Sequence, residues 1–298
     1  MRALVVSDGK VGHQNQSEAL LKHLKIDYDV VVVRKQSALT KPLAYICDKL
    51  HIDSLSFYDI DEVVGDDYGY VVGTGSLTYH IVEVLAKRYS AKSIAMMLPK
   101  GFSYKRFDYI FAQEHDNFSK LANIIPLPIN FSYLEPKGLY KPTQKSIGII
   151  VGASNTTHKI TIEKLKHYLD DIKDKFSDYQ IAITTSPRTS KDIEELIEGY
   201  RFDYELIYSK TPQNPIADFL EYCEYVFISS DSTSMISESV SYGQSCVEVL
   251  DFATNEDNKY TKMQQQLQNG GYIHIFDGKV AYANRKVNLL EYAKRIEL

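Results

Sequence analysis

Two polar segments, each following a predicted buried strand, carry side chains suited to chemistry. The segment SSDSTS, residues 229–234, leads into a short helix that Gly243 ends. Backbone N–H groups at the start of a helix are unpaired and, with the positive end of the helix dipole, form a natural seat for phosphate. Glu238, one turn further on, could accept hydrogen bonds from the vicinal hydroxyls of a sugar. The alternative interpretation is an ordinary helix between two strands, capped by Asp231 or Ser232.

The second segment, SDGKVGHQN at residues 7–15, crowds polar side chains around two glycines at the start of a helix. Gly9 and Gly12 would let the backbone approach a ligand closely. The spacing matches neither a P-loop nor the GxGxxG of a dinucleotide site. Asp8 and His13 are the acid and base candidates, because an imidazole can accept a proton from an attacking hydroxyl near neutral pH. The alternative is a capped helix with an incidental histidine.

Further polar turns follow other predicted strands. Arg188, within TTSPRTS, could contact a diphosphate through two hydrogen bonds; otherwise it is a surface arginine near a helix start, where the dipole disfavours it. Residues 152–155 (GASN) could contact phosphate or a base. Residues 73–76 (GTGS) fit a functional turn and an ordinary tight strand-to-helix turn equally well. We interpret residues 114–116 (EHD) as a loop rather than a metal site, because adjacent side chains point in different directions. Residues 59–61 (DID) resemble a metal-binding DxD but lie in an acidic stretch, which favours a solvated loop.

The composition excludes some classes of protein. The chain has 298 residues, 44% of them hydrophobic and 24% charged, as in soluble globular proteins. A net charge of -5 argues against a sequence-independent nucleic-acid binder. The three cysteines are isolated, which favours a reduced, disulfide-free protein. We expect no signal peptide, because a strand begins directly with no basic segment or cleavage site ahead of it, and the isolated cysteines favour a cytoplasmic location. The sequence leaves open a peripheral contact with the inner face of the membrane.

Strands and helices alternate along the chain, which predicts an α/β fold with parallel sheets and right-handed crossovers. We place an interdomain linker at residues 124–142, which contain four prolines. The predicted domains are residues 1–140 and residues 141–298, each Rossmann-like, with loops that face a common cleft. The final helix, at residues 287–296, is free to pack back on the N-terminal domain. Strands are predicted at residues 2–6, 29–34, 70–72, 93–97, 107–112, 146–151, 180–184, 204–208 and 225–228.

Several of these segments, taken in order, resemble the signature blocks of the ELM-type (mitochondrial fission ELM-like) family. These blocks are SDGKVGHQNQSEAL, FDYIFAQEHDN, TTSPRTS, an NP before a helix, and SSDSTSMISESVSYGQ. The family comprises bacterial proteins taken to be glycosyltransferases and a plant mitochondrial-fission adaptor. The resemblance runs from Ser7 to about Val249 and implies a GT-B fold, with two Rossmann-like domains whose parallel sheets face a central cleft.

The last of these blocks also looks like the donor-binding block of the N-acetylglucosaminyltransferase that completes lipid II. There, the glutamate that matches Glu238 holds the donor ribose, and the histidine that matches His13 lies near the acceptor. The chain departs from the family pattern at three turns. Pro187 stands where the family usually has a second arginine, GASN replaces GGPS, and Gln113 replaces a proline.

Together, the turns and the resemblance predict a metal-independent glycosyltransferase without a cofactor. It would move a sugar from a nucleotide-diphosphate sugar to a glycan or lipid-linked acceptor, in the synthesis of cell-envelope polysaccharide. The alternatives are a non-catalytic adaptor on the same fold and a sugar-nucleotide epimerase. The predicted catalytic residues are His13 and, as the alternative base, Asp8. The predicted donor residues are Arg188, Ser154, Asn155, Asp231, Ser232, Thr233, Ser234 and Glu238. The predicted residues on the acceptor side are Gly9, Lys10, Gly12, Asn15, Gly75, His115 and Asp116.

Overall fold

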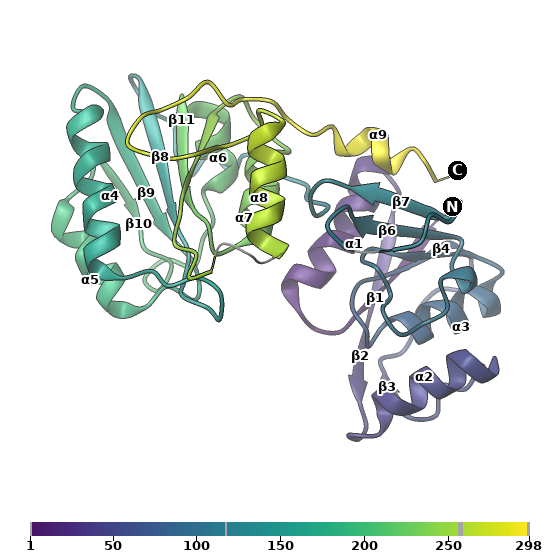
Figure 1. Ribbon diagram of the computed structural model, residues 1–298. Helices are drawn as coiled ribbons and strands as arrows, with labels where there is room; N and C mark the ends of the chain where they lie inside the picture. Colours follow the sequence, from purple (N-terminus) through teal and green to yellow (C-terminus); the bar gives the residue numbers. More distant parts are fainter. Residues whose placement is uncertain (1, 117, 256–258, 297–298) are drawn as a thin grey trace. The chain divides into compact units, whose positions relative to one another are not determined.

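The chain folds into two compact α/β units, seen in the computed structural model (Figure 1). The structure describes residues 2–116, 118–255 and 259–296. Unit 1 comprises Met1–Tyr133 and Asn288–Leu298, and unit 2 comprises Leu134–Val287. Helix α9 (Leu289–Ala293) belongs to unit 1, where it packs against α1 (Val11–Leu24).

Unit 1 contains a seven-stranded sheet in the order β3-β2-β1-β4-β5-β6-β7. Every neighbouring pair is parallel except β2 and β3. The alternation of helix and strand in the sequence therefore correctly predicted a parallel sheet. The strands are β1 (Arg2–Ser7), β2 (Tyr28–Lys35), β3 (Tyr58–Ile60), β4 (Tyr68–Gly73), β5 (Lys92–Ala95), β6 (Tyr109–Gln113) and β7 (Ile124–Leu127). The other helices are α2 (Thr40–Leu50), α3 (Tyr79–Tyr89) and the short 3-10 helix η1 (Tyr104–Arg106).

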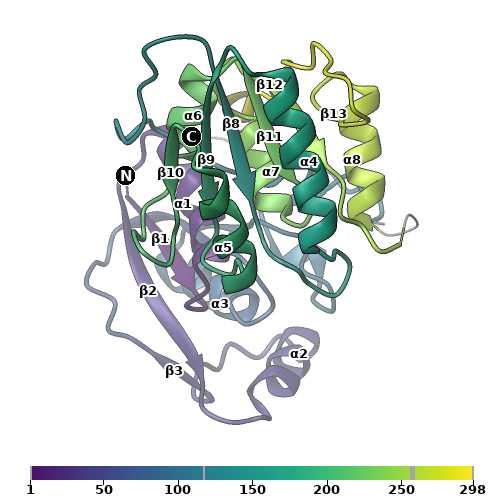
Figure 2. The same cartoon turned by 90° about the vertical axis from the view of Figure 1, so that its left-hand side faces the viewer.

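Unit 2 contains a six-stranded parallel sheet in the order β10-β9-β8-β11-β12-β13. Helices α4 and α5 cover one face, and α6 and α7 lie on the other (Figures 1 and 2). The strands are β8 (Ser146–Val151), β9 (Gln180–Thr185), β10 (Tyr204–Leu206), β11 (Tyr225–Ser229), β12 (Cys246–Leu250) and β13 (His274–Ile275). The helices are α4 (Ile162–Lys175), α5 (Lys191–Tyr200), α6 (Ile216–Tyr222), α7 (Thr233–Ser239) and α8 (Lys259–Asn269).

The continuous apolar runs of the strands follow from burial on both faces of each sheet. In β8, Ile147 and Ile149 pack into the cluster beneath α4 and α5, which includes Leu165 and Ile193. On the opposite face of the same strand, Gly148 lies so close to Phe219 of α6 that a Cβ there would meet the ring at 2.8 Å. The glycine therefore sets how closely α6 approaches the sheet.

The structure differs from the sequence-based expectation at several places. The predicted linker at residues 124–142 was wrong at its start, where β7 adds a strand to the sheet. Pro126 is tolerated there because β7 is an edge strand, where one side needs no backbone donor. Asp59 lies in the edge strand β3 rather than in a loop. The polar helix α8 was not predicted, because its apolar face is reduced to Met263 and Leu267.

The order of strands creates one reversal point in each sheet. In unit 1 the chain winds outward in both directions from the pair β1 and β4, and in unit 2 from the pair β8 and β11. Loops that leave the carboxyl ends of such a pair diverge to opposite faces, and the crevice between them is where open α/β sheets bind ligands. The polar segments at residues 7–15, 73–76, 152–155 and 229–234 all follow these four strands.

The turn between α7 and β12 offers a test of the fold. Gly243 has a φ of +74°, and a Cβ there would lie 2.0 Å from the carbonyl oxygen of Leu220. We expect Gly243→Ala to lower the free energy of unfolding by about 2 kcal/mol or more, because alanine disfavours this backbone region and the Leu220 carbonyl would have to move. Urea denaturation measures the effect. Gly199→Ala is the control, since Gly199 lies in α5 with no atom within 4 Å of a new Cβ. Equal losses in both variants would contradict this packing.

Candidate functional site

An aspartate–histidine pair lies at the reversal point of unit 1. Both carboxylate oxygens of Asp8 lie 3.1 Å from Nδ1 of His13, and one lies 2.7 Å from Nζ of Lys10. The Asp8 side chain is only 2% exposed, whereas that of His13 is 28% exposed. Within the described part of the chain, no group bonds Nε2 of His13. A proton on Nδ1 satisfies Asp8 and leaves Nε2 as a proton acceptor that faces solvent.

The turn after β4 holds this histidine from the other side. Gly75 has a φ of +95°, and a Cβ there would lie 2.6 Å from Nδ1 of His13. The hydroxyls of Ser17 and Thr74 bond each other at 2.8 Å, which ties α1 to the same turn. The GTGS segment therefore needs its second glycine, because Gly75 lies directly against the imidazole of His13.

The electrostatics of Asp8 suit it to orient the imidazole. Burial by itself would raise the pKa of Asp8, but the hydrogen bond from Lys10, the charge of His13 and the Lys10 amide outweigh it, so the pKa is lowered. A carboxylate that stays ionised and paired is a poor proton acceptor. Asp8, the alternative base in the sequence analysis, therefore has the contacts of a positioning residue.

The other predicted acceptor-side residues surround the same sheet edge. Gly9 has a φ of +77°, and nothing lies within 4 Å of a Cβ built at Gly12. Asn15 is exposed on α1. Asp116, which follows β6, forms an ion pair with Lys100 at 2.6 Å.

Tyr79 was missed by sequence reasoning, and its surroundings show that the loops converge. Burial, followed by the charges of Asp116 and Asp8, raises the pKa of the Tyr79 phenol. The Tyr79 hydroxyl donates to the carbonyl of Met97, just beyond β5, at 3.0 Å. His115 is half-buried in the same loop as Asp116. The hydroxyl of Tyr79 therefore ties the start of α3 to the loop after β5.

Unit 2 carries a cavity of about 300 Å³ at its own reversal point. Most of the predicted donor residues line it, from the loops that follow β8, β9 and β11. The lining residues are Asn155, Thr156, Thr157, Arg188, Asp231, Ser232, Thr233, Ser234 and Tyr260. The Arg188 side chain is exposed, and its guanidinium has no partner among the residues that the structure describes. The structure therefore brings an unpaired cation beside a row of hydroxyl side chains.

The start of α7 is capped by Ser232 rather than Asp231. The hydroxyl of Ser232 accepts a hydrogen bond from the amide of Met235 at 3.3 Å. The amides of Ser232 and Ser234 have no partner in the described ranges. The carbonyl of Ser230 accepts a hydrogen bond from the buried Gln264 of α8, which holds this loop against that helix.

Three predicted donor residues have their polar atoms engaged within the protein. The carboxylate of Asp231 is buried and accepts hydrogen bonds from the Ala153 amide at 3.0 Å and the Ser229 hydroxyl at 2.6 Å. The amide oxygen of Asn155 accepts from Thr157 and its nitrogen donates to the Asp231 carbonyl. These bonds join the loop after β8 to the loop after β11.

Ser154 does not line the cavity, since its hydroxyl bonds both backbone groups of Ile160. The contacts thus give Asp231, Asn155 and Ser154 a role in shaping the site, and direct ligand contact by them stays a prediction.

Glu238 lies one turn beyond this loop and is half-buried. Its carboxylate has no partner within residues 2–116, 118–255 and 259–296. Burial raises its pKa to about 7. An unpaired, partly desolvated carboxylate is a strong acceptor for hydroxyl groups of a ligand.

The described residues contain no cluster of three or more His, Cys, Asp or Glu side chains that could hold a metal ion. Asp59 and Asp61, which resembled a DxD motif, form ion pairs with Arg34 instead. In the ranges that the structure describes, no helix is long and apolar enough to cross a bilayer.

A profile of the mitochondrial fission ELM1 family matches residues 11–296, which is nearly the whole chain. The chain belongs to this family. The comparison confirms the resemblance seen in the signature blocks, and the family assignment covers both units. A search of curated protein sequences found no match.

Solved structures resemble this ELM1 family member in fold. The glycosyltransferase SnogD from Streptomyces nogalater has a TM-score of 0.51 at 11% identity, covering 99% of this chain and 93% of that one. S. aureus MnaA in complex with UDP has a TM-score of 0.50 at 13% identity, with 99% and 87% covered. A Listeria monocytogenes protein assigned as a UDP-N-acetylglucosamine 2-epimerase has a TM-score of 0.52 at 12% identity, with 99% and 94% covered. The fold is therefore GT-B-like, with two predominantly parallel sheets, as predicted.

Tyr260, Thr156 and Thr157 line the cavity but were missed by sequence reasoning. Tyr260 is the second residue of α8, and the four-residue spacing of Met263 and Leu267 is the weak signal that could have revealed this helix. Thr156 and Thr157 extend the GASN segment by two residues.

The pKa of Glu238 predicts a pH dependence of stability. The folded protein binds more protons than the unfolded chain between the ordinary pKa of 4.5 and the raised value of about 7. The free energy of unfolding should therefore fall as the pH rises through this window, by up to about 3 kcal/mol, with no loss below it. Glu238→Gln should remove this dependence, as measured by urea denaturation from pH 4 to 8. Glu163→Gln, in the exposed first turn of α4, is the control. If the free energies of unfolding of the wild type and Glu238→Gln differ by the same amount at every pH, the burial of the Glu238 carboxylate is contradicted.

Proposed function

We propose that this ELM1 family member is a glycosyltransferase that uses a nucleotide-diphosphate sugar and needs no metal ion. The observation that carries the proposal is the unpaired guanidinium of Arg188 beside Ser232 and Ser234 in one cavity of unit 2. The proposed acceptor is a hydroxyl of a glycan or a lipid-linked sugar of the cell envelope, and the proposed location is the cytoplasm.

The donor half of the proposal rests on charge. Breaking the bond between the sugar C1 and the phosphate oxygen leaves negative charge on the diphosphate. Arg188 can meet that charge with two parallel hydrogen bonds, and the free amides of Ser232 and Ser234 add two more donors. Donors that are already in place where charge develops are commonly worth a few kcal/mol each. In this proposal these groups do the work of a divalent cation.

Glu238 supports the nucleotide end of the donor. We assign its free carboxylate to the ribose hydroxyls, which need an acceptor. Tyr260 of α8 also lines this cavity. Asp231, Asn155 and Ser154 hold the loops that carry the contacting groups.

The acceptor half rests on the Asp8–His13 pair. Nε2 of His13 takes the proton of the acceptor hydroxyl while its oxygen forms the new bond to the sugar C1. Asp8 holds Nδ1 and stabilises the imidazolium that results. We assign Gly9, Lys10, Gly12, Asn15, Gly75, His115 and Asp116 to the acceptor side.

Two other functions remain open to test. The epimerase alternative is kept because one of the solved structures of similar fold is assigned as an epimerase. An epimerase would convert a nucleotide sugar with no acceptor present. A non-catalytic adaptor would have no need for an unpaired Arg188 or a free Nε2 on His13.

Nucleotide binding tests the donor cavity directly. We expect at least one of UDP, GDP, CMP and TDP to raise the melting temperature of the wild type. Arg188→Ala should raise the dissociation constant of that nucleotide by roughly 10- to 100-fold, because a charge-assisted hydrogen bond is worth about 1.5–3 kcal/mol. Glu238→Ala should weaken it as well. Calorimetry gives the constants. Arg88→Ala, an exposed arginine on α3 of unit 1, is the matched control. No shift with any nucleotide would favour the adaptor.

Turnover tests His13. We expect His13→Ala to lower kcat by roughly 100- to 10,000-fold while leaving the dissociation constant of the donor nucleotide unchanged, since general-base catalysis contributes in that range. The measurement is release of nucleoside diphosphate in the presence of an acceptor. His23→Ala is unsuitable as a control because that ring bonds the Ser132 carbonyl, so exposed His167→Ala serves instead. An equal fall in kcat and in donor affinity would make His13 a binding residue.

A further inference from the structure

A chain of side-chain hydrogen bonds runs along α1 to the glycine turn. The hydroxyl of Ser7 donates to Oε1 of Gln14 at 2.8 Å, and Nε2 of Gln14 donates to Oε1 of Glu18 at 2.7 Å. The hydroxyl of Tyr28, the first residue of β2, donates to Oε2 of Glu18 at 3.0 Å. We name these four side chains, Ser7, Gln14, Glu18 and Tyr28, the α1 relay. The proposed mechanism assigns none of them a role toward either substrate.

The charge of Glu18 sets the direction of every bond in the α1 relay. An ionised carboxylate only accepts, so the amide of Gln14 must turn its nitrogen toward Glu18 and its oxygen toward Ser7. An amide oxygen also only accepts, so the hydroxyl of Ser7 must give its proton to Gln14. The lone pairs of Ser7 Oγ are then left to accept the backbone amide of Gly9, at 3.2 Å.

The protonation states of the end groups keep this direction constant near neutral pH. Burial by itself would raise the pKa of Glu18, but the hydrogen bonds from Gln14 and Tyr28 and the charge of Lys22 outweigh it, so the pKa is lowered. Nζ of Lys22 lies 3.4 Å from Oε2 of Glu18. Burial and the bond to Glu18 raise the pKa of Tyr28 to about 12, so its phenol keeps the proton that it donates.

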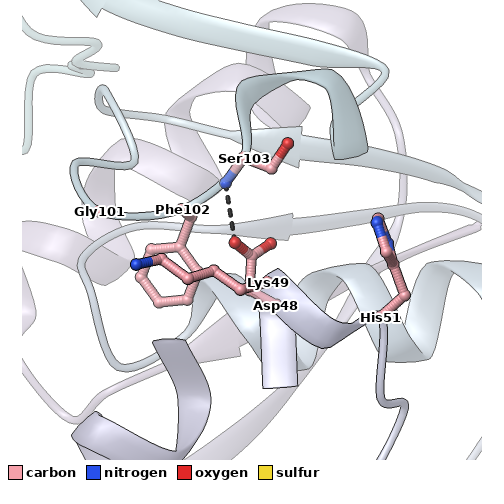
Figure 3. A pocket seen from close by; sticks show the side chains of 6 residues that line it. All are labelled: Asp48, Lys49, His51, Gly101, Phe102 and Ser103. Carbon is pink, nitrogen blue, oxygen red and sulfur yellow. Dashed lines mark hydrogen bonds between the residues drawn. The ribbon is translucent and has the colours of Figure 1, made fainter. Parts of the chain in front are cut away.

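The partners of Glu18 distinguish it from a carboxylate that only supports a loop. Asp48, in the cavity shown in Figure 3, accepts a hydrogen bond from the backbone amide of Ser103 at 2.9 Å. That bond holds one loop against α2. Among the residues that the structure describes, Glu18 accepts only from side chains. Its bonds therefore lead, through Gln14, into the glycine turn.

The α1 relay closes this turn around the Asp8–His13 pair. Ser7 precedes Asp8 and Gln14 follows His13, so the Ser7–Gln14 bond joins the same two backbone segments as the Asp8–His13 bond. The bond from the Gly9 amide to Ser7 also spans Asp8. Ser7 is only 1% exposed, so bulk water cannot take the place of Gln14. Both neighbours of the pair are thus fixed by one set of bonds.

We propose that Glu18, acting through Gln14 and Ser7, is a positioning residue that holds His13 in the tautomer with its proton on Nδ1. When the relay is broken, the turn loosens and the Asp8 carboxylate no longer holds Nδ1. The imidazole can then carry its proton on Nε2, where it cannot accept one from an acceptor hydroxyl. The effect on turnover rests on the proposed function, whereas the effect on the tautomer does not.

A charge swap tests the direction of the relay. Gln14→Glu alone places two carboxylates face to face and should break the relay. Gln14→Glu/Glu18→Gln should restore every bond. The new carboxylate at position 14 accepts from Ser7 and from the new amide at position 18, whose oxygen accepts from Tyr28. A residue that acts only through its volume would not show this recovery.

Nitrogen-15 NMR of the histidine side chains of the full chain reads the tautomer directly. The chain has eight histidines, and the signal that His13→Gln removes identifies His13. At about pH 8 we expect the proton of His13 on Nδ1 in the wild type and in Gln14→Glu/Glu18→Gln. In Gln14→Glu the proton should move to Nε2. Gln14→Met, which breaks the relay without adding charge, should show the same movement and serves if Gln14→Glu does not fold.

Release of nucleoside diphosphate gives the effect on the reaction. We expect Gln14→Glu to lower kcat by roughly 10- to 100-fold with no change in nucleotide affinity, because a misplaced base costs about that much. The charge swap should recover kcat to within about threefold of the wild type. Gln266→Glu, the same change at an exposed residue of α8, is the matched control and should leave kcat unchanged.

The inference is overturned if His13 keeps its proton on Nδ1 in folded Gln14→Glu and Gln14→Met. It is also overturned if the charge swap is folded by circular dichroism but retains the tautomer of Gln14→Glu. A wild type that binds no nucleotide and shows no turnover would contradict the proposed function, and the NMR result would still decide the role of Glu18.

Discussion

Both candidate sites depend on a constraint of parallel sheets. Right-handed crossovers carry the chain outward from a central pair of strands, so the loops after that pair leave in opposite directions and no backbone fills the space between them. In unit 1 the pair is β1 and β4, whose loops bring His13 and Gly75 together. In unit 2 it is β8 and β11, whose loops line the cavity that holds Arg188 and Ser232.

Three carboxylates near these strand ends differ in their hydrogen-bond partners and burial, and therefore in what each can do. Asp8 is buried but paired with Lys10 and His13, so it stays ionised and orients the imidazole. Asp231 is buried against Gly152, and its hydrogen bonds join two loops. Glu238 has no partner in the described part of the chain, and burial leaves its pKa near 7. Of the three, only Glu238 keeps its acceptor capacity for a ligand.

The sequence by itself determined the elements with strong local signals: the apolar strand β8 and the parallel alternation appear in the structure as predicted, whereas helix α1 begins at Val11 and takes in residues 11–15 of the predicted polar turn. Only the tertiary structure decided which polar atoms remain free. Asn155 and Asp231 are 76 residues apart, yet the side-chain nitrogen of Asn155 donates to the Asp231 carbonyl. The sequence pattern had predicted that this side chain would contact a ligand. Likewise, Gly75 supports His13 from a different strand, and Tyr260 joins the cavity from the weakly patterned α8. The local periodicity of the sequence indicates which side chains are buried. The hydrogen-bond partners of a polar side chain can lie far away in the sequence, and only the packing of the fold brings them together.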